Sequence, residues 1–271
     1  MAKLRKAKPG RGKIYAPIIE KIFLRHYKKG SSSFEFERDE IVEVARELKI
    51  DLPKNLGDLI YSFRFRRALP DTILATCKEG ECWTIEGAGI ARYRFHLGKE
   101  SWVTPRPDQY RIKIPDATPE IIDKYAMDDE QAVLAKVRYN RLIDVFTGIV
   151  AYSLQNHLRT GVKGIGQIEI DELYVGVNKN GQQFIIPVQA KGGRDRLATV
   201  QMKQDVAFCA ERFPALLCKP VAVQFMAEDV IAMFELRADG DELRVVEEKH
   251  YVLVAHESIT EQELKEMGKA D

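Results

Sequence analysis

The sequence predicts a mixed α/β protein with two domains, because two sets of helix-like and strand-like segments follow one another in different orders. Three helix-like segments and a pair of strands fill residues 15–97, whereas helix, strand, strand, helix, strand is the order over residues 128–227. Four prolines and little periodicity indicate a linker at residues 98–119. We therefore expect a boundary near residue 115, with domains of residues 1–115 and 116–271.

The composition is typical of a water-soluble globular protein, with 45% apolar and 31% charged residues. No stretch approaches the roughly 18 apolar residues that a membrane-spanning helix needs, and the N-terminus lacks the apolar segment of a secretory signal. Four cysteines without a Cys-x-x-Cys pair predict neither a zinc site nor a disulfide framework. A reducing cytoplasm is therefore the expected compartment.

The net charge of +1 hides a strong difference between the two ends of the chain. Ten basic residues and one acid fall within residues 1–29, whereas thirteen acids and five bases follow from Met226 onward. A basic arm that carries Lys3, Arg5 and Lys6 is typical of a segment that contacts nucleic-acid phosphates. A merely solvated terminus is the alternative interpretation. The acidic C-terminal region would either repel nucleic acid or lie on its far side.

Apolar residues at helical spacing predict three helices in the first domain, over residues 15–29, 36–50 and 55–69. Three strand-like pieces follow, separated by glycine-containing turns, at residues 72–77, 82–87 and 90–97. Three short helices followed by a two-stranded hairpin is the order of a winged helix-turn-helix. The first domain is therefore expected to bind double-stranded DNA.

The third helix and the hairpin carry the arginines that are expected to contact DNA. Arg64 and Arg67 project together at i, i+3 spacing, and Arg66 lies on a neighbouring stripe. Arg92 and Arg94 share one side of the second hairpin strand. A recognition helix needs such a cationic face to meet phosphates and guanine edges in the major groove. The alternative is that these arginines only cover packed aromatic residues.

The second domain begins with one or two helices, the longer of which is expected to run from Asp128 to Asn156. Its apolar stripe consists of Val133, Val137, Leu142, Val145 and Ile149. Two β-rich runs follow, joined by Asn180-Gly181, which is a strong hairpin signal. Residues 199–214 then predict a helix, and residues 220–227 predict a further strand.

Alternation along the two strands puts the polar residues of this hairpin on common faces. Glu169 and Asp171 share one face of the first strand, and Gln189 and Lys191 share one face of the second. Pairing across the hairpin would bring Asp171 close to Gln189 and Lys191. An ordinary sheet edge with a solubilising lysine is the alternative interpretation.

Asp171 within IEIDE and the tripeptide Gln189-Ala190-Lys191 resemble the motif of the PD-(D/E)xK nuclease superfamily, in particular its type II restriction endonucleases. The resemblance covers about residues 130–227, with glutamine in place of the usual carboxylate. Residues 54–96 also look like winged-helix domains attached to such enzymes. The resemblance implies a restriction-endonuclease-like mixed β-sheet flanked by helices, a homodimer, and the cytoplasm of a prokaryote with a restriction system.

For the site, the resemblance implies Mg²⁺-dependent cleavage of double-stranded DNA at a specific sequence, with Mn²⁺ as a substitute ion. Asp171 would be the principal metal ligand. Gln189 and the backbone carbonyl of Ala190 would supply further oxygens. Lys191 would hold the attacking water or stabilise the scissile phosphate.

The neutral side chain of Gln189 removes one charge from the metal site that the resemblance implies. Glu169 or Glu172 is expected to compensate, and Glu169 is geometrically the easier candidate because it shares the face of Asp171. The helix that follows carries Gln201 and Asp205 at i, i+4 spacing. Gln201 is expected as an accessory beside the site.

The alternative function is that of a DNA-binding or regulatory protein whose nuclease fold has lost activity. Gln189 would then be the mark of that loss. Asp171 and Lys191 are both present, which favours an active endodeoxyribonuclease over this alternative.

Overall fold

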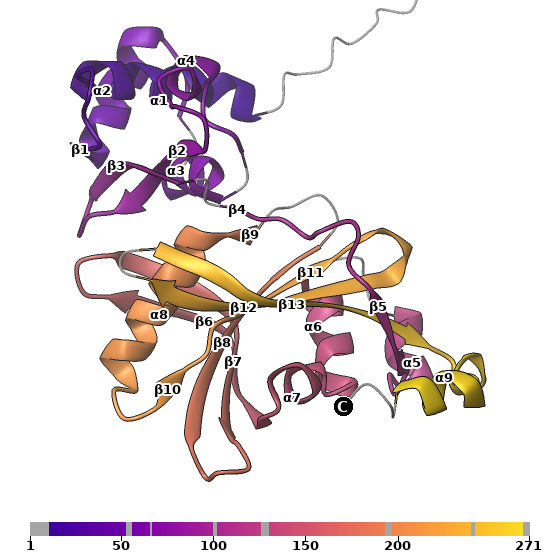
Figure 1. Cartoon of the computed structure of the whole chain (residues 1–271). Coiled ribbons are helices and arrows are strands. Elements are labelled where there is room, and N and C mark those ends of the chain that lie inside the picture. The colour runs from indigo at the N-terminus through magenta and orange to yellow at the C-terminus, as the bar shows by residue number, and fades with distance from the viewer. Residues whose placement is uncertain are drawn as a thin grey trace, which may run out of the picture. The chain divides into compact units, whose positions relative to one another are not determined.

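The computed structural model describes residues 11–52, 56–65, 67–99, 102–125, 130–192, 197–239 and 242–267. The chain forms two compact units, which are described separately (Figure 1). Unit 1 comprises residues up to Ser101 together with Lys163–Gly166, and unit 2 comprises Trp102–Val162 and Gln167–Asp271. No helix within the ranges described is long and apolar enough to cross a lipid bilayer.

Unit 1 combines helices with a three-stranded antiparallel sheet in the order β1-β3-β2. Its elements are α1 (Arg11–His26), β1 (Ser33–Glu37), α2 (Arg38–Leu48), α3 (Leu56–Phe65), α4 (Asp71–Leu74), β2 (Glu81–Gly87) and β3 (Arg92–Lys99). The hairpin β2–β3 pairs from Glu81–Lys99 to Gly87–Tyr93, and β1 adds to the outer edge of β3. The strand β1, which precedes α2, is thus paired with β3, which follows α3. The resulting sheet packs on the helices in one core.

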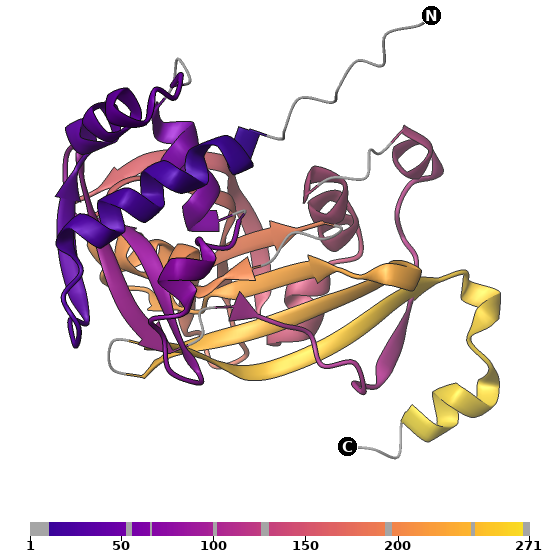
Figure 2. The same cartoon turned by 90° about the horizontal axis from the view of Figure 1, so that it is seen from above.

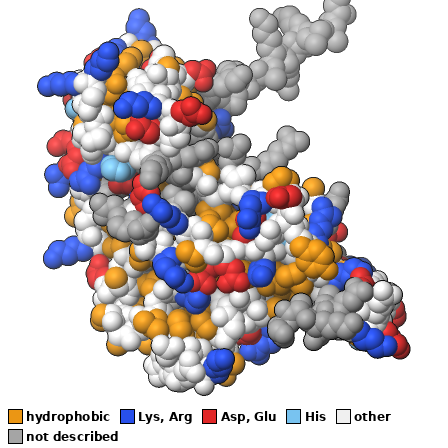
Figure 3. Space-filling view, in the orientation of Figure 1, with side chains coloured by type: hydrophobic (Ala, Val, Ile, Leu, Met, Phe, Trp, Pro, Cys, Tyr) orange, Lys and Arg blue, Asp and Glu red, His pale blue; other side chains and the backbone are white. Residues whose placement is uncertain are grey.

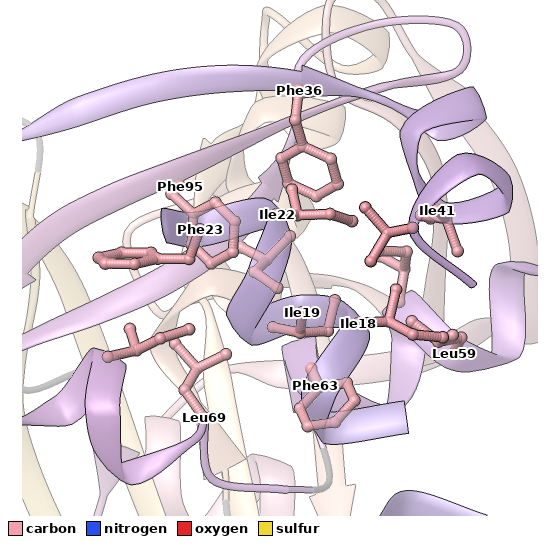
Figure 4. Close-up of a cluster of buried hydrophobic side chains, with 14 of the residues drawn as sticks. Ile18, Ile19, Ile22, Phe23, Phe36, Ile41, Leu59, Phe63, Leu69 and Phe95 are labelled. Carbon is pink, nitrogen blue, oxygen red and sulfur yellow. The ribbon is translucent and has the colours of Figure 1, made fainter. Parts of the chain in front are cut away.

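The core of unit 1 is built around one face of α1. Ile18, Ile19, Ile22 and Phe23 recur at helical spacing, and all four are fully buried. Figure 4 shows these side chains pointing toward residues from α2, α3 and the sheet, including Ile41, Leu59, Phe63 and Phe95. The ring of Phe23 packs edge-on against Phe95 and Trp83, with centroids 5.2 and 5.1 Å apart. Each such buried side chain contributes on the order of 1.5–3 kcal/mol of transfer free energy.

The second predicted helix is confirmed as α2, but residues 33–37 before it form the strand β1, which was not expected and in which Phe34 and Phe36 alternate at strand spacing. Glu37 is the N-cap of α2 and forms a capping box with Glu40. The prediction of a strand at residues 72–77 is wrong. Residues 71–74 form α4 instead of a strand, with Pro70 directly before the first turn.

Unit 2 contains a large mixed sheet in the order β5-β13-β12-β11-β8-β7-β6, with β10 beside β8, and the short pair β4-β9. Its strands are β4 (Trp102–Val103), β5 (Arg111–Pro115), β6 (Val150–Val162), β7 (Gly166–Val177), β8 (Gln183–Lys191), β9 (Leu197–Ala198), β10 (Leu217–Cys218), β11 (Val221–Phe225), β12 (Val230–Asp239) and β13 (Glu242–Val254). Its helices are α5 (Glu120–Tyr125), α6 (Glu130–Tyr139), α7 (Leu142–Thr147), α8 (Thr199–Arg212), α9 (Glu261–Met267) and the 3-10 turns η1 (Ala227–Asp229) and η2 (His256–Ser258).

The sheet of unit 2 has helices on both faces. The helices α6 and α7 pack on Ile186, Val188 and Ala190 of β8, and α8 covers the opposite face with Met202 near Ala222 and Phe234. The neighbours β8 and β11 are parallel, and α8 is the crossover that joins them. Strands β8 and β11 and helix α8 therefore form one βαβ unit, with α8 above the side chains that point away from α6.

The predicted helix from Asp128 to Asn156 is wrong. Helix α6 ends at Tyr139, α7 ends at Thr147, and the strand β6 begins at Val150. Arg141 and Gly148 adopt left-handed φ values of 50° and 66°, which interrupts the helical run at both places. Val145, expected in the buried stripe, is 51% exposed.

The proline-rich stretch also differs from expectation, because it contributes strands to unit 2. Residues 111–115 form β5, which pairs in parallel with β13 from Arg111–His250 to Pro115–Val254. The expected boundary near residue 115 lies at the end of this strand, whereas the two units divide at Ser101. Much of the acidic C-terminal region forms the long hairpin β12–β13, shown in gold and yellow in Figure 2.

Candidate active site

The hairpin β7–β8 places the residues of the predicted motif at one end of its ladder. The antiparallel ladder runs from Val177–Gln183 to Glu172–Val188, and the turn contains Asn178 and Gly181, whose φ is 75°. The Asn180-Gly181 hairpin prediction is therefore confirmed. Beyond the last pair, β8 continues along β11, where Gln189 pairs with Ala222 and Lys191 pairs with Gln224. The end of β8 is thus supported by β11 while β7 contributes side chains.

Asp171 makes two contacts with the end of β8. Its Oδ2 atom accepts a hydrogen bond from the backbone N–H of Ala190 at 2.9 Å. The same oxygen lies 3.9 Å from Nζ of Lys191, and the two side chains are only 13% and 11% exposed. Charges that are sheltered from water interact more strongly than surface pairs. Asp171 and Lys191 therefore form an anion and a cation fixed next to each other at low solvent exposure.

Gln189 joins β8 to both β7 and α8. Its Nε2 atom donates to the carbonyl oxygen of Glu169 and to Oδ2 of Asp205, each at 2.9 Å. Its Oε1 atom is buried and has no hydrogen-bond partner among the described residues. Because one amide nitrogen makes both contacts, the amide oxygen is held in a fixed direction with its acceptor capacity unused.

Asp205 is the residue of this site that sequence reasoning missed. It lies on α8 and is 1% exposed, and its Oδ1 atom is a second buried oxygen without a partner in the described part of the chain. Burial raises the pKa of its carboxyl well above the ordinary value. The hydrogen bond from Gln189 acts in the opposite direction, and the nearby charge of Asp171 raises the pKa further. The i, i+4 spacing to Gln201 was the available signal in the sequence.

Gln201 lies one helical turn before Asp205 on α8, as its spacing predicts. It is buried, and its Oε1 atom also lacks a partner among the residues described. Buried acceptors without donors are unfavourable by about 1–3 kcal/mol each, and native proteins contain few of them. Three such oxygens, on Gln189, Gln201 and Asp205, therefore indicate a polar site whose acceptors could bind a donor or a cation.

The donor set at this end of β8 fits a hard divalent cation. Mg²⁺ prefers oxygen ligands, and carboxylate and amide oxygens are the groups present here. Within the described ranges, no three His, Cys, Asp or Glu side chains gather closely enough to bind a metal by themselves. A Mg²⁺ site would therefore combine the carboxylate of Asp171 with amide or backbone oxygens.

The two glutamates expected to compensate for Gln189 lie in different surroundings. Oε1 of Glu169 is 3.3 Å from Nη2 of Arg159 and 3.6 Å from Nδ1 of His157. Glu172 points to the other face of the sheet, where its Oε1 atom accepts from Arg138 at 3.0 Å and from Ser153 at 2.8 Å. The structure brings Glu172 together with α6 and β6, and not with Asp171, because neighbouring strand residues alternate in direction.

The arginines expected to contact DNA differ in how far they are exposed to solvent. Arg64 is turned inward: its Nε atom donates to the carbonyl oxygen of Ile85 at 3.1 Å, and burial lowers the pKa of its guanidinium. This position differs from the expected cationic face and follows from the packing of α3 on β2. Arg67 is exposed. Arg66, Lys3, Arg5 and Lys6 lie outside the described residues.

Arg92 and Arg94 project from β3 beside one acid. Nη2 of Arg94 is 2.6 Å from Oε1 of Glu35, and Nη1 of Arg92 is 3.7 Å from Oε2. The hydrogen bond from Arg94 is the main cause that lowers the pKa of Glu35. On the face of unit 1 seen in Figure 3, basic side chains lie among acidic ones. Part of the positive charge of the β3 surface is thus neutralised within the protein.

Comparisons with family models, with curated proteins and with solved structures found no match for the chain. The contacts among Asp171, Gln189, Lys191 and Asp205 are therefore the basis for a functional proposal. They combine a fixed ion pair, low solvent exposure, and buried oxygens that lack donors within the described ranges. Such a combination is suited to binding a cation next to a negatively charged substrate.

Proposed function

We propose that the chain is a Mg²⁺-dependent endonuclease that cleaves double-stranded DNA, in the manner of a type II restriction enzyme. The observation that carries the proposal is Nζ of Lys191 at 3.9 Å from Oδ2 of Asp171, near buried oxygens that have no donor among the described residues. The order α6, α7, β6, β7, β8, β9, α8, β10, β11 also supports a restriction-endonuclease-like core, with β9 and β10 as short additions of two residues each. The resemblance assigns Lys191 and Asp171 to catalysis, and their ion pair supports that assignment.

Hydrolysis of a phosphodiester needs a deprotonated water and compensation of the charge that develops on the phosphate. A Mg²⁺ ion supplies both when it is bound by oxygen ligands. Asp171, Oε1 of Gln189 and the carbonyl of Ala190 are the groups that would hold it. The ammonium group of Lys191 orients the attacking water or a non-bridging phosphate oxygen. Asp171 fixes the position of that ammonium group through their ion pair.

Unit 1 is proposed to be a winged helix-turn-helix that positions the DNA. Its order α1, β1, α2, α3, α4, β2, β3 and its sheet order β1-β3-β2 support this assignment. Arg92 and Arg94 on β3 and the exposed Arg67 are the candidates for phosphate contacts. Cleavage of both strands would require two copies of the site, which favours a homodimer.

Cleavage assays with purified protein test the proposal. Phage and plasmid DNA, each with and without base modification, are incubated with Mg²⁺, Mn²⁺ or EDTA. We expect metal-dependent cleavage that is lost in Asp171→Asn and in Lys191→Ala. Lys249→Ala removes an exposed lysine from the same sheet and should leave cleavage unchanged. Sequence-specific DNA binding without cleavage in either metal would instead support the inactive regulatory protein.

A further inference from the structure

We propose that Asp205 supplies the second carboxylate of the metal site and that Gln189 is the residue that positions it. This inference rests on the metal-dependent activity proposed above. The acid that compensates for Gln189 is then Asp205 on helix α8, and not Glu169 or Glu172. The strand β8 supplies an amide to the site, and the helix supplies a carboxylate.

The surroundings of Asp205 are those of a functional acid more than of a structural one. Its side chain is 1% exposed, yet within the described part of the chain its carboxylate accepts one hydrogen bond, from Nε2 of Gln189 at 2.9 Å. A buried carboxylate is unfavourable unless it is paired with a cation and well hydrogen-bonded. Oδ1 of Asp205 has no partner within the described residues. A bound cation would be a partner for this oxygen and would remove the unfavourable free energy of burying it.

The oxygens around Asp205 point to a cation as the ligand. Oε1 of Gln189 and Oε1 of Gln201 are buried acceptors without partners in the described part of the chain. Gln189 contacts Asp205 directly, and Gln201 lies one turn away on the same helix. Acceptor oxygens attract a metal ion and repel an anion. The buried acceptor oxygens of these two glutamines therefore indicate a cation independently of Asp205.

The charges of the neighbouring residues agree with a divalent ion. Asp171 forms an ion pair with Lys191, whose Nζ lies 3.9 Å from its Oδ2, and Asp205 would be a second anion once a cation is bound. Two carboxylates and one ammonium group would then leave an excess of one negative charge. Glu169 and Glu172 already have arginine partners, Arg159 and Arg138. Oδ1 of Asp205 lacks a partner among the residues described, and Asp205 also contacts Gln189.

Besides offering its own oxygen to a metal ion, Gln189 would hold the carboxylate of Asp205 in position. Its Nε2 atom is anchored by the backbone carbonyl of Glu169, so the carboxylate of Asp205 is held at a fixed position relative to β7. A glutamate at position 189 would place two carboxylates against each other. The glutamine at position 189 and the aspartate at position 205 are thus a matched pair.

Metal binding to the full chain tests this inference without using activity. Free Mn²⁺ is measured by electron paramagnetic resonance during titration of the wild type and of Asp171→Asn, Asp205→Asn and Glu211→Gln. We expect Asp171→Asn and Asp205→Asn each to weaken binding by about tenfold or more, because charge count sets the affinity for such ions. Glu211→Gln removes an exposed acid from the same helix and should bind like the wild type.

An exchange variant distinguishes a ligand from a structural residue. The double variant Gln189→Glu with Asp205→Asn restores two carboxylates and keeps an amide–carboxylate hydrogen bond between the two positions. We expect it to regain at least part of the lost affinity, and it also serves if Asp205→Asn alone does not fold. Wild-type affinity in Asp205→Asn, together with weakened binding in Asp171→Asn, would overturn the inference and leave the nuclease proposal standing. Absence of Mn²⁺ binding in the wild type would overturn both.

Discussion

Nζ of Lys191 lies 3.9 Å from Oδ2 of Asp171, and both side chains are nearly buried. Lys191 is also close enough to Asp205 to favour its charged form. Lys191 is thus a cation that pairs with Asp171 and lies near a second acid. We expect Lys191→Met to destabilise unit 2 by about 1–3 kcal/mol, because it leaves buried acids without a counter-charge. Asp171→Asn should be less destabilising, since Asp205 remains as a partner for Lys191.

Urea denaturation in EDTA at neutral pH measures both variants and the double variant. The double-mutant cycle should give a coupling energy of about 0.5–3 kcal/mol between Lys191 and Asp171. Lys249→Met is the control, as Lys249 is an exposed residue of the same sheet. A coupling energy near zero would contradict the importance of this ion pair for the free protein.

Glu172 gives a second prediction about stability. Its side chain is fully buried, whereas that of its partner Arg138 is 38% exposed, and Nε of Arg138 donates to Oε1 at 3.0 Å. Removing the arginine leaves a charge buried, so Arg138→Met should lower the free energy of unfolding by about 3 kcal/mol. Glu172→Gln instead leaves the charge of Arg138, which is partly exposed to water, and should lower the free energy of unfolding by less. Equal effects in urea denaturation would contradict this asymmetry.

The β7–β8 hairpin shows how much of the site can be predicted from the sequence. Asn180-Gly181 predicts the turn, and the period of two predicts that Asp171 meets Gln189 and Lys191. In the structure Asp171 lies 3.9 Å from Lys191, and Gln189 donates to Glu169 and Asp205. Local rules suffice here because turn and strands are adjacent in sequence. The helix α8 and the strand β11 are also located correctly from apolar patterning.

The remaining elements depend on contacts that a single sequence does not display. The stripe Val133 to Ile149 has helical spacing, but Asn140 ends α6, with its Nδ2 and Oδ1 atoms bonded to Thr118 and Ala117. The strand β6 forms because β7 offers a pairing edge. Asp205 was missed for the same reason, since its role depends on α8 packing against β8. Long-range packing, more than local propensity, decides these elements.

The pair Glu35 and Arg94 leads to a prediction about the proposed DNA binding. Glu35 neutralises Arg94 through a contact of 2.6 Å and also lies beside Arg92. Glu35→Gln should strengthen binding to DNA by several-fold at low salt, because both arginines become available to phosphates. Arg94→Ala should weaken binding and reduce the slope of log K against log salt by about 1.

Fluorescence anisotropy with a labelled duplex at several salt concentrations measures these effects. Glu43→Gln is a matched control, since it removes an exposed acid of α2 that lies 3.7 Å from Arg25. If Glu35→Gln and Glu43→Gln change affinity equally, the effect is one of net charge and β3 does not contact the DNA.

The attachment of α9 to unit 2 should depend on pH. Nζ of Lys113 on β5 donates to Oε1 of Glu263 at 2.6 Å, and Thr260 donates to Oε2 through its N–H at 2.8 Å. The hydrogen bond from Lys113 is the main cause that lowers the pKa of Glu263 from 4.5 to about 2. A carboxyl with a lowered pKa stabilises the folded form above its unfolded pKa, and the contribution is lost as the pH falls through the folded pKa. The attachment should therefore be constant above about pH 4.5 and weaken from there toward pH 2.

Amide hydrogen exchange in α9 measures this attachment. At neutral pH, Glu263→Gln should mimic the protonated carboxyl and speed exchange at Leu264, whose N–H donates to the carbonyl of Thr260 at 3.1 Å. Lys113→Met should have the same effect, because it removes the donor on β5. Lys265→Met is the control, since the pair of Lys265 with Glu261 is exposed and lies within the helix. Exchange that is equally fast in all three variants would mean that α9 is held by its own turn and not by β5.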